Sequence, residues 1–377
     1  MALDAVPFAA RLMGEQPECA LLLAEIFRNN AQLCLQLPQT VVHKVGELAL
    51  RERHAHRWGP WYIAFFGAIT AVGPTPVPRN RNMVLSFLRG QSPGAVLQLG
   101  NNSNFSRLQN MASAFKADGQ LQNPVPAVWT SVHADDAELI YHVRSLEVLV
   151  SLALGRGSEV LTSKAYVSTL LPPTTVLQSL LELKLPPHAQ TAPSSVHRCL
   201  RTQWLRLLQL TAYNIDANLV DEELLLSPQN VDFLRELLRW IEEALDLIPV
   251  NDVGKVKQGV EDMIVSEQWE QYLAALLGCM HQFLLGIYPV LQLRHGPVQI
   301  QELTSFARAA ATSFIRLLPG SPQQQAPGRC LRDPELLYTL AFRVVAAGKT
   351  DDPDTRALLS ARGSQGWQQL AQQQQRQ

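Results

Sequence analysis

The chain has 377 residues, of which 47% are hydrophobic and only 17% are charged. At roughly 150 residues per domain, this length predicts two or three units or one elongated array, with enough apolar residues to bury a sizeable core. The formal net charge is -1 and the pI is about 6.8. Because such a chain has no strongly basic field, we expect no nucleic acid partner.

The cysteines favour a reducing compartment. There are five of them, an odd number, and no two stand in a CxxC pair, which argues against a disulfide framework or a Cys-type zinc site. The N-terminus has no basic segment followed by an apolar core, so no secretory signal is predicted.

Residues 272–290 are apolar enough to be compared with a membrane span. His281 and Gln282 stand at the middle of this segment, however, and its flanks carry no Lys or Arg clusters. We interpret the segment as a buried core helix, with a true span as the alternative. The sequence therefore predicts no direct membrane span and a cytoplasmic location.

Residues 1–90 are predicted to form an N-terminal helical part. Apolar residues recur there at helical spacing, and prolines mark the breaks. The expected helices cover residues 18–37, 40–49, 61–71 and 80–90. Thr40 and Asn80 are the expected N-caps of the second and the fourth, because their side-chain oxygens can accept a hydrogen bond from a free backbone amide.

Residues 91–134 are rich in Gln, Asn, Ser, Gly and Pro, which predicts a long loop or linker, partly disordered, with one short helix near residues 108–115. A C-terminal helical part is expected over residues 135–320. Its helices are predicted at residues 135–155, 174–184, 197–213, 227–248, 266–287 and 301–318. Residues 321–377 are predicted to hold short helices and a Gln-rich disordered tail.

Consecutive helices of about 10 to 20 residues, joined by proline-rich breaks, are typical of helical stacks. No segment alternates like a strand between hairpin turns. The sequence therefore predicts an all-α fold, either an armadillo-like helical solenoid or a stacked helix bundle.

Several polar clusters have the composition of a site without its spacing. No Cys or carboxylate stands at standard spacing from His43, His54 and His56 to complete a tetrahedral metal site, and their arginine neighbours repel a cation. Asp135, Asp136 and Glu138 stand at an expected helix start, where carboxylates complement the helix dipole. We interpret the first cluster as a solvated helix end and the second as a cap.

Two further segments favour helix caps over ligand sites. Residues 351–354 read DDPD but lack the glycine and distal glutamate of a calcium loop. Residues 155–157 read GRG without the GK[ST] that a phosphate loop needs. No Ser, Cys, His and Asp set has catalytic spacing. We predict no catalytic residue, no metal site and no cofactor, with an enzyme of unrecognised type as an alternative.

Arginines are the remaining candidates for a ligand site. Arg51, Arg53 and Arg57 stand at one expected helix end, and Arg79 and Arg81 follow the proline turn. A short helix separates the two groups, so they form a candidate basic patch if that helix folds them together. The ligand itself is not predicted.

Residues 61–73 read WYIAFFGAITAVG, and Val77, Asn80 and Val84 follow in a second helix start. This stretch resembles the FLxxLxxLCxxxG helix and the VxxNQxxV helix start of the RIH domain, the homology domain shared by ryanodine receptors and inositol trisphosphate receptors. Arg81 stands where the family has Gln, and Ala68 or a neighbour stands where it has Cys.

Two later stretches are similar to the same family, in the same order. Residues 141–157 read YHVRSLEVLVSLALGRG, which is similar to the family's YxxQLxLFAxLCxGRN helix. Residues 200–216 read LRTQWLRLLQLTAYNID, which resembles LRxxFxxLxxxxYVD. These motifs concern helix packing, so no catalytic residue is carried over from the family.

The resemblance implies a non-catalytic helical regulatory module of an intracellular calcium-release channel, which relays ligand binding to a pore. The implied partners are other segments or subunits of such a channel, at the cytosolic face of the endoplasmic reticulum membrane. The alternative is a stand-alone armadillo-like scaffold that binds protein partners.

Overall fold

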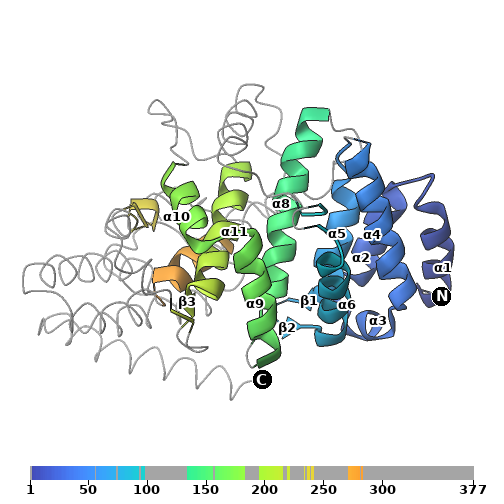
Figure 1. Ribbon diagram of the computed structural model, residues 1–377, viewed down its shortest axis with the longest axis horizontal. Coiled ribbons are helices and arrows are strands. Elements are labelled where there is room, and N and C mark those ends of the chain that lie inside the picture. The colour runs from blue at the N-terminus through green and yellow to red at the C-terminus, as the bar shows by residue number, and fades with distance from the viewer. Residues whose placement is uncertain are drawn as a thin grey trace, which may run out of the picture.

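The computed structural model in Figure 1 describes the N-terminal region and the middle of the chain, namely residues 2–55, 57–73, 75–92, 95–97, 134–155, 158–182, 195–214, 219–220, 233, 236–237, 239–241, 271–280 and 282. The predicted all-α fold is confirmed for these residues. The helices are α1 (Ala2–Leu12), α2 (Glu18–Phe27), α3 (Ala31–Gln36), α4 (Gln39–His54), α5 (Pro60–Thr70), α6 (Pro78–Arg89), α8 (Ala134–Ala153), α9 (Ser158–Leu170), α10 (Pro173–Glu182) and α11 (Ser195–Thr211).

Two very short strand pairs, which the sequence analysis did not predict, interrupt the helical order. β1 (Ala71–Val72) pairs antiparallel with β2 (Thr75–Pro76), and β3 (Tyr213–Asn214) pairs antiparallel with β4 (Leu219–Val220). The first pair turns the chain between α5 and α6. Gly73 lies in that turn with φ of 58°, a left-handed conformation that glycine adopts without steric cost.

The helix predicted over residues 18–37 is two helices, α2 and α3. α2 ends at Phe27, where the C-cap Arg28 leaves the helical conformation with ψ of 124°, and Asn29 follows in a left-handed conformation with φ of 57°. The side chain of Asn30 then accepts a hydrogen bond from the backbone amide of Leu33 and starts α3. The prediction missed the break because the apolar spacing continues across it.

Both predicted N-caps, Thr40 and Asn80, were wrong. α4 begins at Gln39, one residue ahead of Thr40, and α6 begins at Pro78. Asn80 is fully buried in the first turn of α6, where its amide nitrogen donates to the carbonyls of Cys34 and Ile69, at 2.8 and 3.0 Å. These carbonyls lie in the last turns of α3 and α5, where the regular hydrogen bonds of a helix run out; that of Cys34 also accepts the backbone amide of Leu37 at 3.4 Å. Asn80 therefore joins two helix ends.

The helices lie side by side in a row. α1 packs on α2, α2 on α5, α5 on α8, α8 on α11 and α11 on α10, while α4 and α6 flank α5 (Figure 1). The helices predicted near residues 61–71, 135–155, 174–184 and 197–213 are confirmed as α5, α8, α10 and α11. α1 and α9 were not predicted.

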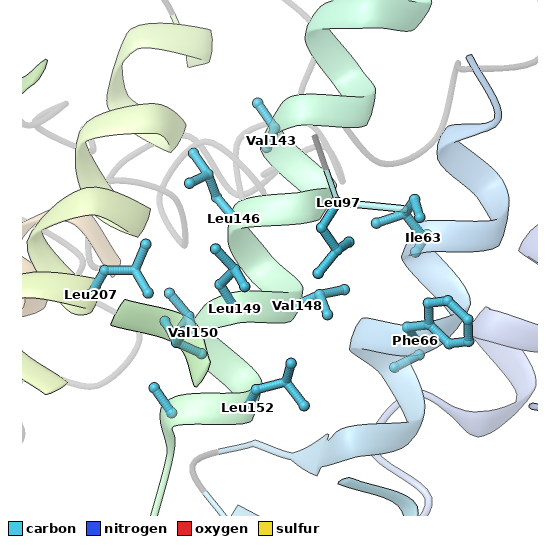
Figure 2. Packing of buried hydrophobic residues seen from close by; sticks show 14 of the residues in the cluster. Ile63, Phe66, Leu97, Val143, Leu146, Val148, Leu149, Val150, Leu152 and Leu207 are labelled. Carbon is cyan, nitrogen blue, oxygen red and sulfur yellow. The ribbon is translucent and has the colours of Figure 1, made fainter. Parts of the chain in front are cut away.

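The centre of the row is α8, which is buried on two sides. Figure 2 shows Val148 directed toward Ile63 and Phe66 of α5, while Leu146 and Val150 point toward Leu207 of α11. All of these side chains are at most 2% exposed. A helix covered on both sides needs apolar residues on both of those sides, as α8 has in its C-terminal half.

Several predicted elements lie outside the described residues. They are the short helix near residues 108–115, the helix at 301–318, residues 351–354 and the Gln-rich tail, together with most of the linker and most of the helix at 227–248. Of the segment at 272–290, residues 272–280 and 282 are described; they are helical, and Tyr272, Leu273 and Leu276 are buried, as expected of a core helix.

Candidate functional site

The five arginines of the candidate basic patch lie in two groups at opposite ends of α4. Arg51 and Arg53 belong to its last turn and Arg57 follows it. Arg79 stands in the first turn of α6 and donates a hydrogen bond to the carbonyl of Leu35, ahead of the first residue of α4. A helix of 16 residues spans ~24 Å. The structure therefore does not bring the two groups together.

Arg51 and Arg57 each contact a nearby part of the chain. Arg51 donates from Nη2 to the carbonyl of Gly14 at 3.2 Å, which fixes the end of α4 beside the chain that follows α1. Arg57 pairs with Glu52, with 2.9 Å between Nε and Oε2. The Glu52 side chain is nearly buried, whereas that of Arg57 is 65% exposed. Both arginines therefore contact other parts of the fold.

Arg81 has a different role, because it is buried and reaches another helix. Only 1% of it is exposed, and its Nη1 donates to the carbonyl of Leu154 at 3.2 Å. Leu154 directly follows α8, so the guanidinium lies at the negative end of that helix dipole. Gly155 comes next with φ of 101°, which confirms the prediction that this glycine belongs to a helix C-cap.

Arg53 is part of an aromatic cluster that joins the α4–α5 junction to α8. We call Arg53, Trp58, Tyr141 and His142 the Trp58 cluster. The guanidinium carbon of Arg53 lies 3.9 Å from the centre of the Trp58 indole and 5.4 Å from that of the Tyr141 ring. The centres of the Trp58 and His142 rings are 5.4 Å apart. A cation over an indole is attracted to the negative face of the ring, so Trp58 holds the end of α4 against α8.

On α8 the cluster continues into a buried stripe of polar residues. Glu138, Tyr141, His142 and Ser145 follow the i, i+3, i+4, i+7 spacing of one helix face, and we call them the α8 polar stripe. Each is at most 5% exposed. Oε1 of Glu138 lies 3.8 Å from Nε2 of His142, which is too long for a hydrogen bond.

The stripe holds polar atoms without a hydrogen-bond partner in the described structure, namely the hydroxyls of Tyr141 and Ser145 and both ring nitrogens of His142. Burial raises the pKa of the Tyr141 phenol, and the nearby charge of Arg53 offsets this only in part. The phenol therefore stays protonated at neutral pH and does not serve as a charged ligand or nucleophile. Each buried group left unpaired costs about 1–3 kcal/mol.

The candidate metal ligands do not assemble in the part of the chain that the structure describes, where no three His, Cys, Asp or Glu side chains group together. His43 lies edge-on to Phe87, with 5.8 Å between the ring centres, and His54 is exposed at the end of α4. His56 is outside the described residues. Asp135 and Asp136 lie in the first turn of α8, as the capping prediction requires.

Among the described residues, the geometry thus places the Trp58 cluster beside the α8 polar stripe and brings no three potential metal ligands together. No protein-family model and no curated protein matches the sequence. In addition, none of the described helices is both long enough and apolar enough to cross a membrane.

Sequence reasoning missed the Trp58 cluster and the α8 polar stripe. Trp58 lies in a connection without periodicity, so no sequence signal pairs it with Tyr141, 83 residues later. The stripe did have a signal, because four polar or aromatic residues at i, i+3, i+4, i+7 share the face that carries Val148, Leu149 and Leu152 one turn further on. The prediction treated Glu138 as part of a helix cap instead.

Proposed function

We propose that this chain is a non-catalytic helical regulatory module of an intracellular calcium-release channel of the inositol trisphosphate or ryanodine receptor type. The observation that carries the proposal is the arrangement of the three stretches that resemble the RIH domain. They form α5 with the start of α6, α8, and α11. These helices are successive neighbours, since α5 packs on α8 and α8 packs on α11.

The residues that carry the resemblance are interior residues. Val77, Asn80 and Val84 of the first stretch are at most 7% exposed, and so are Tyr141 and Leu146 of the second. In the third stretch the buried residues are Leu200, Arg201, Trp204, Leu205 and Leu208. A shared pattern of buried positions is what a common packing of helices requires, and this supports the resemblance.

Two departures from the family pattern in the first stretch also lie in the interior. Ala68, which with its neighbours stands where the family has Cys, is 7% exposed, and its carbonyl accepts a long hydrogen bond from the thiol of Cys34, with 3.9 Å between the heavy atoms. Arg81, where the family has Gln, binds the carbonyl that follows α8. Both substitutions therefore keep a side chain inside the helical stack.

A row of packed helices suits a relay. Side chains in a close-packed interior transmit a displacement because they cannot be compressed independently. α8 lies between α5 and α11 and receives the cap from Arg81 of α6, so it is the element through which a shift at one end of the row reaches the other. We propose that the row is an armadillo-like stack at the cytosolic face of the endoplasmic reticulum, with other channel segments or subunits as its partners.

The test is to find the pore. The full-length transcript that encodes this chain is sequenced, and detergent-solubilised complexes that contain the chain are purified from its native cells and identified by mass spectrometry. We expect a multi-helix pore segment either in the same reading frame or in a co-purifying subunit. A chain that yields partners without any pore protein in either experiment contradicts the proposal.

The alternative is a stand-alone scaffold that binds protein partners, and exposed apolar residues favour it. Phe8, Leu22 and Leu35 are 63%, 56% and 59% exposed, and they come from three consecutive helices at the N-terminal end of the row. Large apolar side chains in contact with water are typical of protein-binding surfaces when they gather in one patch. Partners that are lost from the purified complexes with Phe8→Ser and Leu22→Ser, in the absence of a pore protein, support this alternative.

A further inference from the structure

We draw no further inference here: the strongest candidate, the buried α8 polar stripe beside the Trp58 cluster, carries none because nothing in the structure shows which ligand or partner group meets its polar atoms.

Discussion

One face of α8 is apolar in the C-terminal half of the helix and polar in the N-terminal half. In the C-terminal half this face carries Val148, Leu149 and Leu152, which are fully buried. In the N-terminal half it carries the α8 polar stripe, which is just as buried but leaves several polar atoms unpaired. Equal burial therefore does not mean equal stabilisation. Burial of an apolar side chain stabilises the folded state, whereas burial of an unpaired polar group destabilises it.

The polar contacts of the C-terminal half are paired, in contrast to those of the stripe. The hydroxyls of Thr70 and Ser151 lie 2.6 Å apart and join α5 to α8, and Ser151 also lies 2.7 Å from the carbonyl of Val148. Arg81 binds the carbonyl of Leu154 at the same end. We infer that this half fixes α8 in the row more firmly than the N-terminal half, where part of the gain from burial is offset by unpaired polar atoms.

The largest effect is expected for Leu149→Ala. The side chain is completely buried in the apolar half, so its truncation removes apolar contacts and leaves a cavity, at a cost of about 2–5 kcal/mol in the free energy of unfolding. Urea denaturation measures the change. Leu161→Ala is the matched control, since Leu161 is 42% exposed on α9. Equal losses for the two variants would contradict the assignment of the core.

Arg81→Met is expected to come next, with a loss of about 1.5–3 kcal/mol, because methionine fills much of the same space but cannot donate to the carbonyl of Leu154. Arg79→Met is the control: Arg79 is exposed and lies only two residues away. Thermal denaturation of both variants makes the comparison. Arg79 keeps a hydrogen bond to the carbonyl of Leu35, but this contact is at the surface. A loss for Arg79→Met as large as that for Arg81→Met would contradict the greater weight given to the buried cap.

Thr70→Val is expected to cost about 1 kcal/mol, since it keeps the shape of the side chain but removes the hydroxyl that meets Ser151. Thr169→Val provides a control with similar local chemistry, because Thr169 also bonds the carbonyl four residues earlier but is exposed on α9. Chemical denaturation of both variants distinguishes the contact between helices from a bond within one helix. If Thr70→Val leaves the free energy of unfolding unchanged, the hydroxyl pair does not stabilise the α5–α8 contact.

Ser145→Ala is expected to have the smallest effect, a change within about 0.5 kcal/mol or a slight gain in stability, because its buried hydroxyl has no partner to lose. Ser151→Ala, in the other half of the helix, is expected to cost about 1 kcal/mol. Denaturation curves for the pair test the comparison directly. A loss above 1 kcal/mol for Ser145→Ala would mean that the Ser145 hydroxyl does have a hydrogen-bond partner.

The sequence predicted the helices that bury large apolar residues and failed where polar or small residues make up part of the buried face. Val160, Ser163, Lys164 and Val167 form the buried face of α9, and two of these residues are polar. The i, i+3, i+4, i+7 spacing is present, but a search for apolar residues does not detect it. α1 buries Val6, Ala9 and Ala10, and two of these three residues are small.

Contacts between distant segments could not be read from the sequence at all. The ends of α4 and α6 that carry the five candidate arginines are near each other along the chain, yet α5 and the first strand pair lead α6 back to the start of α4. The guanidinium of Arg53 instead lies over the rings of Trp58 and Tyr141, which contact each other. Which of several arginines is buried depends on this tertiary path, and helical periodicity carries no information about it.

The side chain of Asn80 has a consequence for how the molecule opens. α3 has only six residues, too few for a helix to persist alone in water. Because one amide group bonds the carbonyls of both Cys34 and Ile69, unravelling α3 leaves that amide half paired in the interior and weakens the end of α5 as well. Amide hydrogens of α3, α5 and the first turn of α6 are therefore expected to exchange with solvent as one cooperative unit. Although α3 has less than two turns, its amide hydrogens are then protected from exchange for as long as those of α5.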